Sequence, residues 1–403
     1  MLLILGLFSG TLFKKLGLPK ITGYLVSGFL IINLAEPYLP KNYLQTSEIL
    51  VILGLAFISF EVGGQLAKER FLGLGKTIAW ITFFTMLFPF VVVGIGFSLL
   101  LSLIYGSSSI EIMTVCIPAS LLLAALSAPT DPTPLLVISH EKKVSGPVTS
   151  SIFGITAIDD LIAVLLFIFV FLISKILASP AEGFSLLTIS DTLFWLFLSV
   201  SLGLLIGLSI KFACAFLVKQ TDGLLIILLF GTLSFIAGLS GFFEIDVIAT
   251  SMTMGIFIRN FSPNEHRLFD LLERYSDEMI TLLFFTLSGL HLKMAFIKPL
   301  IPLIIVFVIL RGLGKYLGVL AGAKISDAPE SIKKYLTPGL IPQGGIVIGL
   351  ALLVLKTPEM EPFSDLVFNI VIGATFIHGL AGPLLTIFTL RRAGEIPQNP
   401  TAL

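Results

Sequence analysis

Charged residues are scarce in this chain: Asp, Glu, Lys and Arg make up only 12% of its 403 residues. A soluble globular protein carries about 25% charged residues, so the charge is too low to cover a water-soluble surface of this size. Lys and Arg number 25, and so do Asp and Glu, which gives a net charge of zero. Because there is no basic surplus, nucleic acid is excluded as a partner.

Tryptophan, tyrosine and cysteine are also few, with 2, 7 and 2 residues. Cys116 and Cys214 both lie in apolar runs and at no spacing typical of a metal site, so we interpret them as packing residues. Phenylalanine is abundant instead, with 35 residues, which is typical of lipid-facing segments. Hydrophobic residues make up 56% of the chain, and the mean hydropathy is +1.04. The sequence therefore predicts an integral membrane protein.

Long apolar runs recur along the whole chain. A helix that crosses about 30 Å of hydrocarbon needs about 20 mostly apolar residues. The first run begins at Met1 but lacks the basic start and the cleavage site of a signal peptide, so we expect it to span the membrane. The runs predict an all-α polytopic fold with about 13 transmembrane helices, near residues 1–14, 20–34, 47–67, 77–105, 111–138, 148–174, 190–218, 223–240, 243–259, 277–296, 299–323, 335–355 and 364–390.

The basic residues between these runs indicate an orientation. With the N-terminus outside, 18 of the 25 Lys and Arg residues fall on joints and a tail that face the cytoplasm, against five on the other side. Basic loops stay cytoplasmic, so we expect an outer N-terminus and a cytoplasmic C-terminus in the cell membrane. The longest polar joint, from Arg259 to Asp277, predicts a surface loop with a short amphipathic helix, and no separate soluble domain is expected.

Charges inside an apolar span are costly, so they are candidate functional residues. Asp131 lies in the run Ala-Pro-Thr-Asp-Pro-Thr-Pro at 128–134, where three prolines remove backbone donors and break the helix. Broken backbone at membrane depth is tolerated only when protein buries it or a watery cavity adjoins it. Asp131 is therefore a candidate site residue, able to neutralise a positive half-helix end. The alternative is that the prolines end the span near the cytoplasm.

Two adjacent carboxylates, Asp159 and Asp160, lie inside the apolar stretch 148–174. Both cannot be ionised cheaply at low dielectric, and they face different partners because each helical step turns about 100°. One can be held by a fixed cation while the other binds a mobile cation or a proton. Thr156 lies four residues before Asp160 and could help to coordinate that ion. A water-exposed helix end is the weaker alternative, because residues 161–173 remain apolar.

Arg311 and Lys315 lie four residues apart in the span 299–323, on one helical face. A buried lysine needs an anion, and the Asp159–Asp160 pair is the obvious one. The alternative is that Lys315 snorkels to the cytoplasmic surface. Glu61, near a cytoplasmic span end, either forms an ion pair with Arg311 or lies at the interface.

Two weaker signals complete the pattern. The run Pro342-Gln343-Gly344-Gly345 predicts a closely packed helix start in the span 335–355. The four histidines are placed near span ends and form no metal cluster, although His378, next to Gly379, could modulate a pH response.

These residues together resemble the second monovalent cation/proton antiporter family, the bacterial Na⁺/H⁺ antiporters and their Kef-type K⁺/H⁺ relatives. The resemblance covers nearly the whole chain. Its most specific part is the Asp159-Asp160 pair followed by Lys315. Supporting matches are Leu18-Pro19 to Gly28, Phe60-Glu61, Gly314-Lys315-x-x-Gly318, Pro342 to Gly345, and Gly382-Pro383 to Glu395.

The resemblance implies a Na⁺/H⁺ antiporter fold. Residues 1–403 are expected to form one transmembrane exchanger domain, with inverted repeats, interleaved core and dimerisation subdomains, and two crossed broken helices. Thr130 and Asp131 match the first break, and the segment after Gly339 matches the second. A homodimer without cofactors is implied.

The resemblance also assigns roles. Asp160 matches the carboxylate that transiently binds Na⁺, Li⁺ or K⁺, or else a proton. Asp159 matches its neighbour that pairs with a core lysine, for which Lys315 is the first candidate and Arg311 the reserve. Thr130-Asp131-Pro132 is more similar to exchangers of the first family, which usually carry Asn-Asp rather than Asp-Asp, so the stoichiometry stays open.

The expected function is exchange of Na⁺ or Li⁺ for H⁺ by alternating access. A Kef-type K⁺/H⁺ antiporter is the alternative, although such relatives often carry a cytoplasmic nucleotide-binding domain and this chain ends at Leu403. A remote alternative is an intramembrane aspartyl protease that uses Asp131 and Asp160, but its Gly-x-Gly-Asp motif is absent. A channel would leave the intramembrane lysine unexplained.

Overall fold

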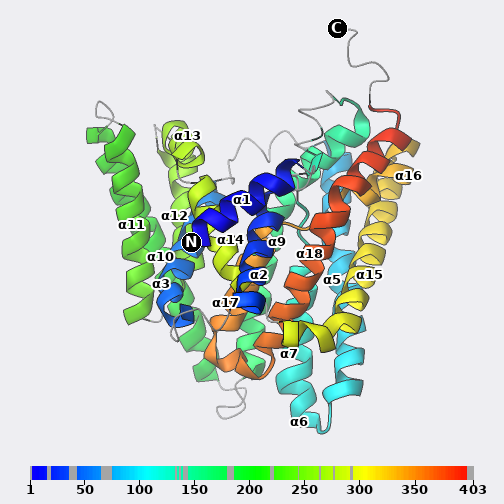
Figure 1. The fold of residues 1–403 in the computed structure, drawn as a ribbon, viewed down its shortest axis with the longest axis horizontal. Coiled ribbons are helices and arrows are strands. Elements are labelled where there is room, and N and C mark those ends of the chain that lie inside the picture. The colour runs from blue at the N-terminus through cyan, green and yellow to red at the C-terminus, as the bar shows by residue number, and fades with distance from the viewer. Residues whose placement is uncertain are drawn as a thin grey trace. The chain divides into compact units, whose positions relative to one another are not determined.

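The structure, a computed structural model, describes residues 2–15, 20–35, 43–64, 75–131, 134–135, 138, 144–178, 186–217, 222–243, 245–262, 265–275, 277–290 and 294–396. Every regular element among them is a helix (Figure 1). The helices are α1 (Leu2–Lys15), α2 (Lys20–Ala35), α3 (Tyr43–Gly64), α5 (Lys76–Tyr105), α6 (Ser109–Glu111), the π-helical turn η2 (Ile112–Cys116), α7 (Ile117–Leu126), α9 (Pro147–Ala178), α10 (Leu186–Leu217), α11 (Asp222–Phe242), α12 (Val247–Phe261), α13 (Glu265–Tyr275), α14 (Asp277–Leu290), α15 (Met294–Ile325), α16 (Glu330–Gly339), α17 (Gly345–Lys356), the short 3₁₀ turn η3 (Pro358–Met360) and α18 (Glu361–Arg392).

These helices divide into two compact units, each built from segments that are far apart in the sequence. Unit 1 holds α3, α10 to α14 and most of α2, while unit 2 holds α5 to α9 and α15 to α18. The chain passes between the units several times, and α1 is divided between them. Unit 1 comprises Met1–Ser9, Gly23–Leu72 and Ser185–Leu292, and unit 2 comprises Gly10–Thr22, Gly73–Phe184 and Lys293–Leu403.

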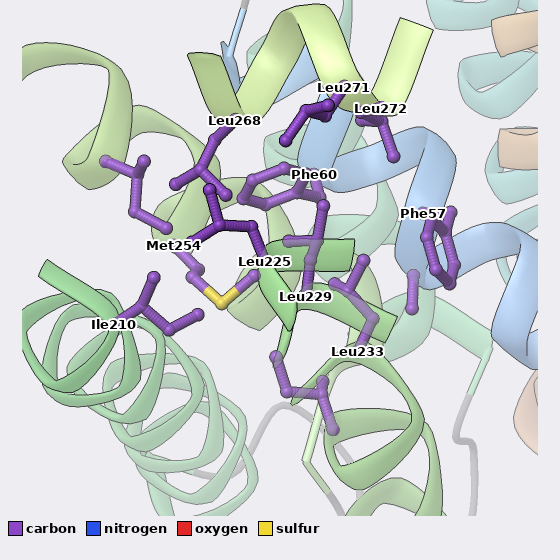
Figure 2. Packing of buried hydrophobic residues seen from close by; sticks show 13 residues of the cluster. Phe57, Phe60, Ile210, Leu225, Leu229, Leu233, Met254, Leu268, Leu271 and Leu272 are labelled. Carbon is purple, nitrogen blue, oxygen red and sulfur yellow. The ribbon is translucent and has the colours of Figure 1, made fainter. Parts of the chain in front are cut away.

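Unit 1 is held together by close contact of α3 with α12. A Cβ atom added to Gly63 of α3 would lie 2.1 Å from the Met252 carbonyl oxygen, and one added to Gly255 of α12 would lie 2.2 Å from the Phe60 carbonyl oxygen. Only glycine lets the two backbones approach this closely. Figure 2 shows the adjoining apolar cluster, in which Phe60 of α3 packs among side chains from α11, α12 and α13, including Leu225, Leu229, Met254, Leu268 and Leu272.

Unit 2 is organised around α5 and α15, which lie side by side (Figure 1). Gly314, Gly318 and Gly322 recur at every fourth position of α15. A Cβ atom at each would lie within 2.5 to 2.6 Å of backbone atoms of α5. This contact fixes the helix that carries Arg311 and Lys315.

Hydropathy located the helices well. Each of the thirteen predicted spans overlaps a helix of the described chain. The expected amphipathic helix in the polar joint is α13, whose leucines are buried while Asp270 is exposed. By length and composition, five helical segments in the described residues can cross a membrane: Lys76–Tyr105, Ser109–Leu126, Asp222–Ser240, Lys298–Ile325 and Pro358–Arg392.

Candidate ion-binding site

Two interruptions of helical structure face each other inside unit 2, the first as the proline run predicted and the second as the family resemblance implied. The first follows the end of α7 at Leu126 and continues to Asp131. The second separates α16 from α17, over residues 340–344. The Asp131 backbone N–H donates to the Pro342 carbonyl at 3.0 Å, so the two breaks are in direct contact. Proline explains their position, because Pro129 and Pro342 cannot donate a backbone hydrogen bond.

Arg311 of α15 binds the carbonyls of both breaks. Its side chain is fully buried, with 0% exposure. On the first break, Nε donates to Ser127 O at 2.9 Å and Nη2 to Pro129 O at 2.6 Å. On the second, Nη1 donates to Ile341 O, and Nη2 lies 3.5 Å from Pro342 O. A helix C-terminus is the negative end of its dipole, so one guanidinium satisfies and neutralises the ends that follow α7 and α16. Arg311 was the reserve partner for Asp159, but its donors bind carbonyls instead.

Lys315, one turn further along α15, lies beside Asp159 of α9. Its Nζ is 3.4 Å from Asp159 Oδ2, donates to Thr130 Oγ1 at 2.8 Å, and also donates to the Ala128 carbonyl. Lys315, Asp159 and Thr130 are all 0% exposed, so the alternative in which Lys315 snorkels to the surface is wrong. Asp159 Oδ1 has no hydrogen-bond partner among the described residues. The structure thus brings together the lysine, one aspartate and the first break.

Asp160 follows on the same helix, and its side chain lies outside the described residues. Thr156 is buried and donates its hydroxyl proton to the Ile152 carbonyl at 2.9 Å. That bond uses the proton and leaves oxygen lone pairs that can accept or coordinate. Thr130 differs, because its hydroxyl oxygen already accepts from Lys315, while its O–H donates to the Leu340 carbonyl at 3.4 Å.

Asp131 lies at the start of α17. A Cβ atom added to Gly344, the N-cap of α17, would lie 3.0 Å from the Asp131 carboxyl carbon. An anion at a helix N-terminus is favourable, because that end carries a partial positive charge. Where the two breaks meet, a cation, Arg311, therefore lies at two negative helix ends, and an anion, Asp131, lies at a positive helix end.

Gln343 and His378 belong to the same constellation, and sequence reasoning missed their connection. Gln343 Nε2 donates to the Leu126 carbonyl at 2.8 Å, and His378 Nδ1 lies 2.9 Å from Gln343 Oε1. Both side chains are buried. The placement of His378 near a span end is wrong, because it lies in the interior of α18. The sequence did contain a signal for His378, because it is a polar residue inside an apolar run. The same criterion singled out Asp159 and Asp160.

The remaining candidate, Glu61, lies half-buried in α3 of unit 1. Its pairing with Arg311 stays a prediction. No group of three or more His, Cys, Asp or Glu side chains suited to a metal ion occurs in the described part of the chain.

Comparison with known proteins identifies the family. A family model described as sodium/hydrogen exchanger, transmembrane, matches residues 2–391. The fold is similar to the sodium proton antiporter MjNhaP1 from Methanocaldococcus jannaschii at pH 8, with a TM-score of 0.68 and 18% identity over 98% of this chain and 95% of that chain. A second structure of that antiporter, from an electron microscopy map, gives a TM-score of 0.62 and 17% identity over 98% and 94%. No curated protein sequence matches significantly.

These matches bear out the expected Na⁺/H⁺ antiporter fold and give no support to the Kef-type alternative. The family model covers nearly the whole chain, including both helix breaks and the helices that carry Asp159 and Lys315. This chain therefore belongs to the sodium/hydrogen exchanger family of membrane transporters.

Proposed function

We propose that this exchanger carries Na⁺ or Li⁺ in exchange for H⁺, with Asp160 as the carboxylate that binds either ion. The observation that carries the assignment is the buried contact of Lys315 with Asp159 beside the two helix breaks. Because a fixed cation already accompanies Asp159, the adjacent Asp160 is the carboxylate left for a mobile one. The unwound backbone nearby offers polar groups that can replace part of a cation's hydration.

Coupling follows from mutual exclusion at Asp160. A charge at the centre of a bilayer costs at least about 2.5–3.5 kcal/mol, so an empty, ionised site moves across the membrane unfavourably. Binding of either Na⁺ or H⁺ neutralises the carboxylate and removes this cost. The site then crosses only when loaded, which links the two fluxes without further machinery.

The other site residues have supporting roles in this proposal. Thr156 has lone pairs available for the cation, one helical turn from Asp160. Thr130 orients Lys315, because its hydroxyl oxygen accepts from the ammonium group. Asp131 and Arg311 compensate the ends of the broken helices and keep them together. Asp159 either retains Lys315 throughout or exchanges a second proton.

The two units suggest how the site moves. We assign unit 2, which carries every described side chain of the site, as the mobile core, and unit 1 as the dimerisation subdomain of a homodimer. The chain would thus form a single exchanger domain in the cell membrane, with an outer N-terminus and a cytoplasmic C-terminus.

The test is transport by protein reconstituted in vesicles, with internal pH recorded after addition of NaCl, LiCl or KCl. We expect Na⁺ and Li⁺ to drive proton movement and the apparent KM for Na⁺ to rise as the pH falls, because protons compete for Asp160. Asp160→Asn should abolish the flux, while Asp365→Asn, at an exposed carboxylate of α18, should preserve it. Proton flux driven by K⁺ alone, or full activity of Asp160→Asn, contradicts the proposal.

A voltage readout tests the stoichiometry. When valinomycin and K⁺ collapse the membrane potential, faster Na⁺-driven exchange means that more than one H⁺ moves per Na⁺ and that Asp159 takes part. Equal rates mean one-for-one exchange, with Asp159 kept by Lys315.

A further inference from the structure

We propose that His378 and Gln343 form a positioning pair that holds the two broken helices in the register required for cation binding. Neither residue is offered as an ion ligand. His378 of α18 holds the Gln343 amide, and that amide ties the second break to the end of α7. The inference rests on the proposed function, because the property that the pair sets is the affinity of the exchanger for Na⁺.

The chemistry of the three groups fixes the direction of the hydrogen bonds. The Leu126 carbonyl can only accept, so the Gln343 amide must present its NH₂ group there. The amide oxygen is then the atom that faces His378, and it too can only accept. His378 Nδ1 must therefore carry a proton and donate it at 2.9 Å. The other ring nitrogen, Nε2, has no hydrogen-bond partner among the described residues, so the pair uses one edge of the ring.

The pair acts on backbone that adjoins the candidate ion-binding site. Leu126 is the last residue of α7, and the next carbonyls along the chain bind Arg311 and Lys315. Gln343 lies between two residues that adjoin Asp131. The Pro342 carbonyl accepts the Asp131 backbone N–H, and a Cβ atom added to Gly344 would lie 3.0 Å from the Asp131 carboxyl carbon. A shift of the Gln343 amide consequently displaces both breaks at the point where they meet.

Packing of α18 supports the same role. His378 and Gly382 are four residues apart and share a helical face. A Cβ atom added to Gly382 would lie 3.1 Å from the Pro342 ring, so this face of α18 lies directly against the second break. Both polar side chains are buried, with exposures of 1% for His378 and 2% for Gln343. Burial of polar groups is unfavourable unless they are hydrogen-bonded, so loss of one of these hydrogen bonds leaves its buried partner unsatisfied.

The decisive comparison uses two substitutions of His378. His378→Asn places an amide nitrogen at the position of Nδ1, the same number of bonds from the backbone, and keeps the donor. His378→Leu removes the donor but fills the space. In vesicles, we expect His378→Asn to keep the KM for Na⁺ within about twofold of the unchanged protein. We expect His378→Leu to raise it about tenfold, the effect of one lost buried hydrogen bond. Gln343→Leu removes both bonds of the amide and should raise it at least as much. Neither variant should change the maximal rate much.

The double variant His378→Leu/Gln343→Leu should show no larger rise in KM than Gln343→Leu alone, because that single variant already removes the whole connection. Multiplied effects in the double variant contradict the proposal, as does a KM for His378→Leu equal to that of the unchanged protein. If His378→Asn is impaired as strongly as His378→Leu, the imidazole itself matters and the positioning role is wrong.

A spectroscopic measurement tests the pair independently of transport. The chain has four histidines, so nitrogen NMR of histidine-labelled protein, with His378→Asn as the subtraction, isolates the His378 signal. We expect the spectrum to show a proton on Nδ1. The chemical shift of this nitrogen should change in Gln343→Leu. A His378 with its proton on Nε2 alone overturns the pair. Absence of cation-driven flux in the unchanged protein defeats the proposed function instead, and the NMR result still decides whether the pair exists.

Discussion

At the scale of single residues, the buried charges of Lys315 and Asp159 compensate each other at the candidate ion-binding site. Lys315 and Asp159 are both fully buried, and their charged atoms are 3.4 Å apart, longer than the roughly 2.7–2.9 Å of a tight charge-assisted hydrogen bond. The ammonium group is shared with Thr130 and the Ala128 carbonyl. Lys315 thus supports the first helix break as well as the aspartate, and its loss should affect both.

We predict that Lys315→Met lowers the free energy of unfolding by about 3–5 kcal/mol, because it leaves the buried Asp159 charge uncompensated. Adding Asp159→Asn should recover much of this loss, since the double variant contains neither charge. Thermal unfolding of the purified protein in detergent measures both effects. Lys298→Met is the matched control, at an exposed lysine of the same helix. Equal destabilisation by the single and double variants contradicts the interpretation as an ion pair.

The sequence limited the partner of Lys315 to the Asp159–Asp160 pair but did not predict the partners of Arg311, for a physical reason. A lysine and an aspartate in apolar spans must find opposite charges, and each had few candidates. Arg311 instead binds backbone carbonyls, which every residue has and no side-chain pattern identifies. The Gln343–His378 contact similarly joins residues 35 positions apart, through an orientation that only the folded helices define.

At the scale of helices, backbone contact between α5 and α15 holds the charged residues of α15 in place. The glycines at 314, 318 and 322 permit this contact. Apolar length predicted these helices, and the prolines of the run 128–134 predicted the first break. The second break, over residues 340–344, was implied only by the family resemblance. The π-helical turn η2 was not predicted, because its apolar sequence does not distinguish it from the α-helix on either side.

We predict that Gly318→Ala destabilises unit 2 by about 1–3 kcal/mol, the usual cost of overpacking, because the new Cβ would lie 2.5 Å from the Phe84 carbonyl oxygen. Gly312→Ala provides a matched control on the same helix, since its Cβ would meet only Ile341 at 3.7 Å. Its effect should be neutral or favourable, because alanine has the higher helix propensity. Thermal unfolding distinguishes the two variants, and equal melting temperatures would falsify the close-contact argument.

The helix that carries Asp159 is capped by a residue from the C-terminal end of the described chain. Glu395 accepts the backbone N–H groups of Val148 and Thr149, each at 2.8 Å, in the first turn of α9. It also accepts the Thr149 hydroxyl at 2.6 Å. Gly146 has a φ of +157°, and a side chain there would collide with the Glu395 carboxyl group. These hydrogen bonds of Glu395 with Val148 and Thr149, here called the latch, anchor the start of α9 to the segment after α18.

Glu395→Gln should weaken the latch, because its NH₂ group cannot accept a backbone N–H. We expect a loss of about 1–3 kcal/mol in unfolding free energy, the cost of leaving a buried donor unsatisfied. Glu361→Gln, at an exposed glutamate in the first turn of α18, is the comparison and should change stability little. Faster amide hydrogen exchange at the start of α9 in Glu395→Gln locates the effect. Unchanged exchange there means that the carboxylate does not hold this helix end.

At the scale of the whole molecule, the distribution of charge indicates the orientation in the membrane, whereas the total charge does not. The net charge is zero, yet 18 of the 25 basic residues fall on one predicted side of the membrane and five on the other. Retention of basic loops in the cytoplasm operates during insertion and does not depend on later packing. The asymmetry therefore predicts an outer N-terminus and a cytoplasmic C-terminus for the exchanger.

Two exposed positions of unit 2 test this orientation. Ser107 lies between α5 and α6, on a joint predicted to be outside, and Lys324 lies near the end of α15, on a joint predicted to be cytoplasmic. In a background without Cys116 and Cys214, Ser107→Cys should react with a membrane-impermeant maleimide added to intact cells. Lys324→Cys should react only after the cells are opened, because the reagent cannot cross the bilayer. The reverse labelling pattern would place the basic joints outside and overturn the orientation. Sodium-driven proton flux in both variants is the control, because it would show that the labelled proteins are correctly folded.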